Sequence, residues 1–191
     1  MKVIGLTGGI GSGKSEAQRY LTSKKIPVID ADRISRDIVK PGSEVLMEIT
    51  DAFGANIILE DGSLDRKALG KIVFSNKEKL DILNNIMHKR ILNEIKHQLA
   101  LIKAPLVVID APLLIETGLY KIVDEVWVID LETHFQIERV KMRDNLSENE
   151  IKKRIHSQLP REERKKYAHV IINNSGTIES LYLQIDQQLN R

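Results

Sequence analysis

The chain has 191 residues, with 29 Lys and Arg against 27 Asp and Glu, which gives a formal net charge of +2. This length predicts one domain, or one core domain with small inserts, and a 42% share of hydrophobic residues excludes an intrinsically disordered chain. So small a net charge gives no overall field that favours nucleic acid, and the absence of cysteine excludes disulfides and thiolate metal sites.

The first predicted element is a buried strand over 3–7, which leads into a glycine-rich turn. Residues 8–15, Gly-Gly-Ile-Gly-Ser-Gly-Lys-Ser, match the pattern G-x-x-x-x-G-K-[ST] in full, and a helix is predicted over 14–24. Glycines let the backbone approach a phosphate closely and adopt positive φ, and the start of a helix adds unpaired N–H groups. Strand, loop and helix together predict a cradle for a nucleoside triphosphate.

The residues of this loop have different predicted roles. The backbone N–H groups wrap the phosphates, Lys14 reaches the β- and γ-phosphates as a point charge, and the Ser15 hydroxyl ligates Mg²⁺. A GTPase is disfavoured, because the sequence has no N-K-x-D segment for reading guanine and no D-x-x-G after a strand. The predicted nucleotide-binding residues of the loop are Gly9, Gly11, Ser12, Gly13, Lys14 and Ser15.

A second strand is predicted over 27–30, and it ends in Asp30-Ala31-Asp32. The carboxyl ends of parallel strands face the ligand crevice of a doubly wound sheet. Asp32 is therefore a candidate to orient an acceptor hydroxyl and to take its proton. The alternative is that an aspartate at this point only caps the next helix, since Asp is a favoured N-cap residue.

The segment that follows reads as mostly helical. Helices are predicted over 65–74 and 77–102, and in the second one apolar residues recur every three or four positions. That spacing forms a single apolar stripe, which we expect to pack against a core. Because the segment is too long for a simple crossover between strands, it predicts an inserted helical subdomain.

Three further strands are predicted over 106–110, 126–130 and 170–173. Like the first two, they are apolar throughout rather than alternating, which is typical of strands buried on both faces of a parallel sheet. Helical patterns separate most of the strands. The sequence therefore predicts an α/β fold with a doubly wound, five-stranded parallel sheet.

The helix predicted after the fourth strand carries Gln136, Arg139 and Arg143 on one face, at i, i+3 and i+7, with Ile137 and Val140 expected on the opposite side. Such a row is either solvated surface or a lid that closes over the triphosphate and neutralises charge in the transition state. The same two interpretations apply to Arg154, Gln158 and Arg161.

Taken together, these residues resemble the dephospho-coenzyme A kinase family along nearly the whole chain. The order and spacing of many short motifs carry the resemblance, rather than any one of them. The motifs are residues 4–15, Asp30-Ala31-Asp32, Gly62-Ser63-Leu64-Asp65-Arg66, Phe74, His88, Pro112-Leu113-Leu114-Ile115-Glu116, the Q-x-x-R-x-x-x-R-D run over 136–144, Gln158, and the segment 171–176.

The resemblance implies an enzyme that uses MgATP to phosphorylate the ribose 3′-hydroxyl of dephospho-coenzyme A, the last step of coenzyme A synthesis. It implies a sheet like that of the P-loop nucleoside monophosphate kinases. Asp32 would be the base or hydroxyl orienter, Arg139 and Arg143 lid residues over the phosphates, and Asn174 a residue near the adenine of ATP. The implied substrate-binding residues are Asp32, His88, Leu113 and Glu116.

The chain departs from the resemblance just after the glycine loop. The family often has Thr after the loop serine, and this chain has Glu16. The backbone N–H of Glu16 still serves to bind phosphate, so Glu16 is counted among the nucleotide-binding residues. Its carboxylate is compatible with a neighbouring phosphate only if it points away.

These patterns predict a single kinase domain in three parts. The sheet core covers 1–32, 104–132 and 168–191, a helical substrate subdomain covers 33–103, and a lid covers 133–167. Two alternatives stay open, a P-loop kinase for a nucleoside monophosphate or other small metabolite, and an ATP-binding module without chemistry. No apolar stretch approaches the ~20 residues of a membrane helix. We therefore expect a cytoplasmic protein with a small-molecule partner and no nucleic acid or membrane partner; no pattern specifies an oligomeric state.

Overall fold

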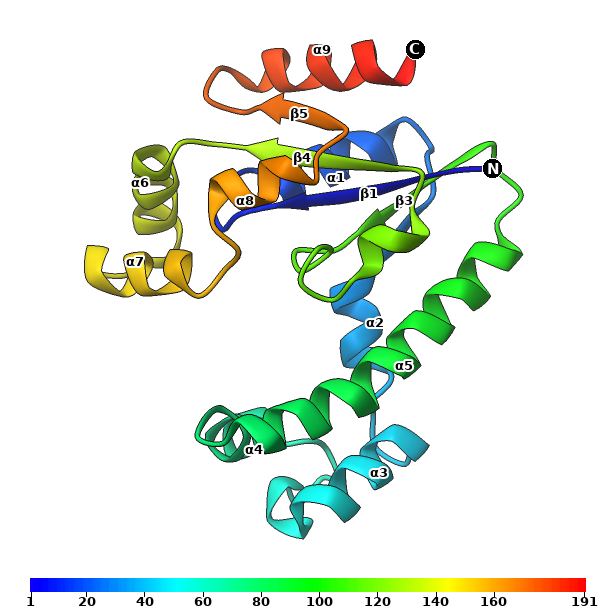
Figure 1. Cartoon of the computed structure of the whole chain (residues 1–191), viewed down its shortest axis with the longest axis vertical. Coiled ribbons are helices and arrows are strands. Elements are labelled where there is room, and N and C mark those ends of the chain that lie inside the picture. The colour runs from blue at the N-terminus through cyan, green and yellow to red at the C-terminus, as the bar shows by residue number, and fades with distance from the viewer. The chain divides into compact units, whose positions relative to one another are not determined.

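The computed structural model describes all residues from Met1 to Arg191. The chain separates into two compact units, one of Met1–Ile29 with Ile102–Arg191 and the other of Asp30–Leu101. Figure 1 shows the elements of both units. None of the helices is both long and apolar enough to cross a lipid bilayer.

The first unit is built on a five-stranded sheet in the order β2-β3-β1-β4-β5. The strands are β1 (Lys2–Gly8), β2 (Val28–Asp30), β3 (Leu106–Asp110), β4 (Glu125–Asp130) and β5 (Val170–Asn173). Strand β1 pairs in parallel with β3 and with β4, and β4 pairs in parallel with β5. The five predicted strands and the parallel α/β fold are therefore confirmed.

Burial of the strands explains why their sequences are apolar throughout. In β4, Val126, Trp127, Val128 and Ile129 are each at most 1% exposed. Helices α1 (Lys14–Ser23) and α9 (Ile178–Leu189) contribute to the same core as the central strands. Their residues in it are Ala17, Leu21, Leu181 and Ile185.

Three helices lie between β4 and β5 in the chain. They are α6 (Thr133–Asp144), α7 (Glu148–His156) and α8 (Arg161–Lys166), and a short 3-10 helix, η2 (Leu119–Ile122), precedes β4. In Figure 1, α9 lies along β5, and α6 and α7 lie beside each other beyond the carboxyl end of β4. This arrangement brings α6 and the segments around it to the edge of the sheet where β1 leads into the glycine loop.

The second unit is helical. Its elements are α2 (Ala31–Asp37), α3 (Glu44–Phe53), η1 (Ala55–Ile57), α4 (Arg66–Phe74) and α5 (Lys77–Leu101). The predicted apolar stripe of α5 does pack: Leu80, Leu83 and Met87 contact a core that contains Ile49 and Val73. Side chains cap several of these helices; Ser43 accepts the Leu46 N–H and Asp65 accepts the Ala68 N–H.

Candidate active site

The loop between β1 and α1 has the backbone that a phosphate cradle requires. Gly11 and Gly13 lie in the left-handed region, at φ 73° and 92°. The Ser12 N–H closes the loop by donating to the Gly9 carbonyl at 3.0 Å. Gly13 is the N-cap of α1 and has no side chain to bond the first amides of that helix. These amides and the positive end of the helix dipole are therefore available to an anion.

Replacement of Gly13 by alanine is expected to destabilise the protein more than replacement of Gly118. Both glycines have positive φ, 92° and 74°, so both variants carry the left-handed strain of about 1–3 kcal/mol. A Cβ on Gly13 would also lie 2.0 Å from Asn174 Nδ2, whereas a Cβ on Gly118 meets nothing within 4 Å. Thermal denaturation of both variants tests this, and equal melting temperatures would contradict the close packing of the loop.

Lys14, near the end of the glycine loop, forms an ion pair with Asp110. Its Nζ is 2.6 Å from Asp110 Oδ1, and the two side chains are 14% and 4% exposed. Asp110 is the last residue of β3 and stands opposite Leu6 in the parallel register, which brings this carboxylate next to the end of β1. The end of β3 therefore positions Asp110, and the start of α1 positions Lys14.

The chain lacks a cluster of side chains that could hold a metal ion without further ligands. No group of three or more His, Cys, Asp or Glu side chains is placed to hold one. Ser15 is exposed in the first turn of α1, directly after Lys14. This donor set fits Mg²⁺, which keeps several waters and is held by one or two protein groups together with substrate phosphates.

Glu16 is turned toward α9. Its Oε1 accepts the hydroxyl hydrogen bond of Tyr182 at 2.5 Å, and its other oxygen pairs with Arg19. The hydrogen bond to Glu16 raises the pKa of Tyr182. Tyr182 is itself stacked on Tyr20 with ring centroids 3.9 Å apart, so these contacts fix where the carboxylate of Glu16 lies.

Side chains from distant parts of the sequence hold the loop in place. The Asn174 side-chain amide donates to the Ser12 carbonyl at 2.7 Å, and Gln158 Oε1 accepts the Ile10 N–H at 2.9 Å. Arg139 donates to the Asn174 carbonyl at 2.8 Å. The amide of Asn174, predicted near adenine, is thus engaged with the loop backbone.

Helix α6 packs directly on the glycine loop. A Cβ on Gly9 would lie 2.9 Å from Gln136 Nε2, and a Cβ on Gly11 would lie 2.9 Å from Val140 Cγ2. Gln136 and Val140 are both buried. The prediction that Val140 lies opposite Gln136 is therefore wrong, because residues at i and i+4 share one face of a helix.

The two predicted lid arginines differ in their surroundings. Arg139 is half-buried, and its Nη1 lies 3.5 Å from the position of a Cβ on Gly13. Arg143 lies one turn further along α6 with a side chain 62% exposed, and it donates two hydrogen bonds to Asp144 at 2.7 and 3.0 Å. This pairing with Asp144 raises the pKa of Arg143. The structure thus brings Arg139 to the loop, while Arg143 contacts Asp144.

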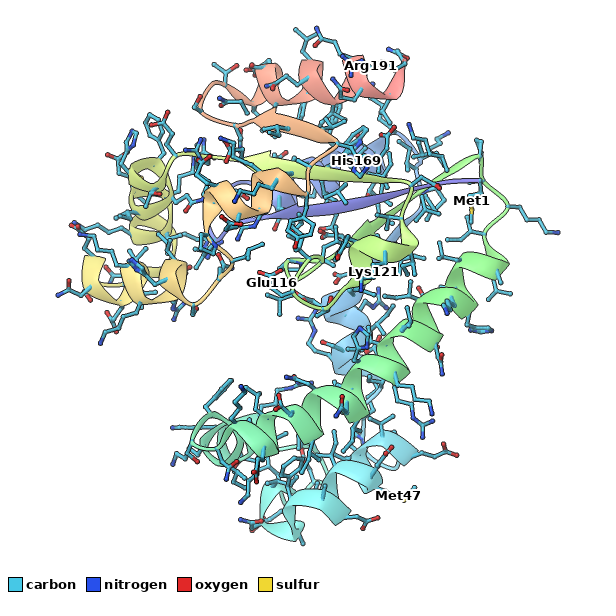
Figure 2. All side chains as sticks on the ribbon, viewed as in Figure 1. Met1, Met47, Glu116, Lys121, His169 and Arg191 are labelled. Carbon is cyan, nitrogen blue, oxygen red and sulfur yellow. The ribbon has the colours of Figure 1, made fainter.

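Two of the predicted substrate residues belong to the first unit. Leu113 is 47% exposed in the turn after β3. Glu116 follows in the same turn, and its Oε1 accepts the Leu159 N–H at 3.2 Å. Figure 2 shows Glu116 on this turn, next to the segment that leads into α8.

The other two predicted substrate residues, Asp32 and His88, belong to the second unit. Asp32 is exposed in the first turn of α2, and His88 is exposed on α5. The helix cap is Asp30, which accepts the Arg33 N–H at 2.9 Å. Asp30 is thus the aspartate that caps the helix, as the alternative interpretation expected of one residue in this pair. The catalytic role of Asp32 stays a prediction.

Sequence reasoning missed Arg164, which is only 4% exposed although it lies in the highly charged segment Arg-Glu-Glu-Arg-Lys-Lys. On the same short helix, Arg161 donates two hydrogen bonds of 2.7 Å to Asp130, the last residue of β4. The only available sequence signal was the i, i+3 spacing of these two arginines, which places them on one face.

Comparisons with known proteins agree with the resemblance noted from the sequence. The family model described as dephospho-CoA kinase matches residues 2–180. The dephospho-CoA kinase of Carboxydothermus hydrogenoformans is 45% identical over 188 residues, which cover 97% of this chain and 91% of that protein.

Two solved structures are similar over nearly their whole length. The dephospho-CoA kinase from Campylobacter jejuni has a TM-score of 0.74 at 31% identity, with 100% of this chain and 96% of that chain covered. The protein TT1252 from Thermus thermophilus has a TM-score of 0.88, also at 31% identity, with 99% and 96% covered. With the loop pattern G-x-x-x-x-G-K-[ST] and a match of family and fold along its length, the chain belongs to the dephospho-CoA kinase family.

Proposed function

We propose that the chain transfers the γ-phosphate of ATP to the ribose 3′-hydroxyl of dephospho-coenzyme A, which yields coenzyme A and ADP in the last step of coenzyme A biosynthesis. The observation that carries the proposal is the glycine loop with Lys14 beside it, in a chain whose relatives are named dephospho-CoA kinase. Membership of a kinase family implies the use of ATP. We propose the cytoplasm as the place of the reaction, which a chain without cysteine suits.

Binding of ATP falls to the loop and to the start of α1. The amides of residues 8–15 surround the phosphates, and Lys14 exchanges its contact with Asp110 for the β- and γ-phosphates. Ser15 would ligate Mg²⁺, whose chemistry is to neutralise negative charge on the phosphate oxygens. The hydrogen bonds from Gln158 and Asn174 hold the loop backbone in the binding geometry before the nucleotide arrives.

Transfer requires an oriented acceptor and a site without water. Asp32 holds the 3′-hydroxyl and takes its proton, while the oxygen bonds to the γ-phosphorus and ADP leaves. Arg139 and Arg143 supply positive charge as the phosphoryl group moves, and exclusion of water prevents hydrolysis of ATP. Leu113, Glu116 and His88 contribute to the binding of dephospho-coenzyme A.

A panel of acceptors tests the proposal against its rivals. Release of ADP would be measured with ATP and Mg²⁺ in the presence of dephospho-coenzyme A, of AMP, of other nucleoside monophosphates, or of buffer alone. We expect turnover with dephospho-coenzyme A far above buffer, and coenzyme A as the product by mass spectrometry. Turnover only with a nucleoside monophosphate would identify a different kinase, and ATP binding without turnover would identify a binding module.

A further inference from the structure

We infer that Arg164 is a phosphate-binding residue, whose guanidinium group obtains its counter-ion from the bound triphosphate. The inference rests on the proposed ATP-dependent function and deepens it, because it adds to the phosphate site a charge from α8, which lies far from the glycine loop in the sequence. Four observations support it: the burial of the side chain, its hydrogen bonds, its contact with the loop, and the contrast with a neighbouring arginine.

Arg164 is a buried cation without an ion pair of its own. The residue is 4% exposed, its Nη2 donates to the Leu159 carbonyl at 2.8 Å, and its Nε has no hydrogen-bond partner. The negatively charged groups that act on Arg164 are the carboxylates of Glu116 and Asp130, and their effect is a Coulombic attraction through space. Each of these carboxylates has another contact, Glu116 with the Leu159 N–H and Asp130 with Arg161.

The charge of Arg164 stands directly against the glycine loop. A Cβ on Gly9 would lie 3.1 Å from Arg164 Nη1, so the guanidinium borders the space that a side chain at Gly9 would occupy. Gln136 Nε2 occupies the same contact at 2.9 Å. Nitrogen atoms of two side chains therefore lie beside Gly9.

Physical chemistry makes this arrangement costly without a ligand. A charge withdrawn from water is expensive unless it is paired and fully hydrogen-bonded, and burial indeed lowers the pKa of Arg164. A polyphosphate in the loop would supply both the opposite charge and the missing acceptors, since arginine matches phosphate oxygens with several donors at once. The unpaired charge of Arg164 thus destabilises the ligand-free protein, and its pairing with phosphate stabilises the complex.

Arg161 shows what a structural arginine looks like on the same helix. It donates two hydrogen bonds of 2.7 Å to Asp130, and Asp130 is buried with a side chain 7% exposed. This pairing raises the pKa of Arg161, the opposite direction to Arg164. Removal of Arg161 would leave a buried carboxylate without its partner, whereas removal of Arg164 would take away a charge that no carboxylate contacts.

The experiment compares Arg164→Met, Arg164→Lys and the matched control Arg161→Met in the full chain. Melting temperature without nucleotide and the dissociation constant of MgATP by calorimetry are measured for each. We expect Arg164→Met to melt at or above the wild-type temperature and to bind MgATP about tenfold or more weakly. Arg164→Lys, which keeps the charge, should recover part of the binding, and Arg161→Met should melt at a lower temperature.

Two results would overturn the inference. Melting of both Arg164 variants well below the wild type would make Arg164 a structural residue, as would wild-type affinity for MgATP in Arg164→Met. Measurements on the wild-type chain show whether the inference about Arg164 alone is wrong or the proposed function is wrong as well. If the wild type binds MgATP and forms coenzyme A while Arg164→Met binds equally well, only the inference about Arg164 is wrong; if the wild type binds no MgATP, the proposed function is wrong, and the inference with it.

Discussion

Lys14→Ala is expected to abolish phosphoryl transfer, with kcat/KM at least about 10³-fold below wild type. Alanine removes the only charged side chain in the segment Gly8–Ser15, and the amides of the loop cannot replace a point charge on the β- and γ-phosphates. The effect should appear in kcat as well as in ATP binding, because charge that moves onto the leaving ADP is stabilised by the same lysine. Steady-state kinetics with dephospho-coenzyme A check the expectation.

A second lysine provides the control for this variant. Lys24 follows the end of α1 and pairs with Asp186 at 3.0 Å, with a side chain 41% exposed. Because exposed ion pairs contribute little, Lys24→Ala should keep near wild-type kinetics. Circular dichroism of Lys14→Ala is also needed, since the variant loses the contact with Asp110. Wild-type turnover by a folded Lys14→Ala protein would remove the loop from the mechanism.

Asp32→Asn is expected to lower kcat by about 10²–10⁴-fold while the affinity for ATP stays close to wild type. Asparagine keeps the size of the side chain and removes its ability to accept a proton. The fold should be preserved, because Asp30 and not Asp32 forms the cap of α2. Single-turnover kinetics separate the chemical step from substrate binding.

The control for Asp32→Asn lies at the other end of the same helix. Asp37 is exposed and pairs with Lys40 at 2.9 Å, a pairing that lowers the pKa of Asp37. Asp37→Asn should leave kcat unchanged. An effect of Asp32→Asn that is confined to the KM of dephospho-coenzyme A would show that Asp32 only binds the acceptor, and the proposed proton transfer would then need another base.

Much of the fold was predictable because its determinants are local. The strands are apolar throughout, as β3 and β4 show, and the Gly-rich turn between β1 and α1 has a known pattern. Strand β2 begins at Val28, one residue later than predicted, because Pro27 has no N–H to donate to the sheet. The Pro27 carbonyl still accepts the Val108 N–H at 2.9 Å. Such boundary errors do not change the topology.

The supports of the glycine loop were less predictable, because they depend on tertiary contacts. Gln158 and Asn174 lie far from residues 8–15 in the sequence, and both bond the loop backbone. The position of Val140 on the same face of α6 as Gln136 follows from the helical period, since the two residues are four apart. Arg164 could not be distinguished from exposed charged residues, since its neighbours in α8 are charged and its burial arises only in the folded chain.

The central claim is that residues 8–15 bind the triphosphate that is transferred. A crystal structure of the full chain with Mg²⁺ and a non-hydrolysable ATP analogue tests it most directly. We predict the β- and γ-phosphates within hydrogen-bond distance of the amides between Gly9 and Ser15, with Lys14 Nζ turned from Asp110 to the phosphates. Triphosphate bound at another place on the chain, with Lys14 still paired to Asp110, would contradict the account.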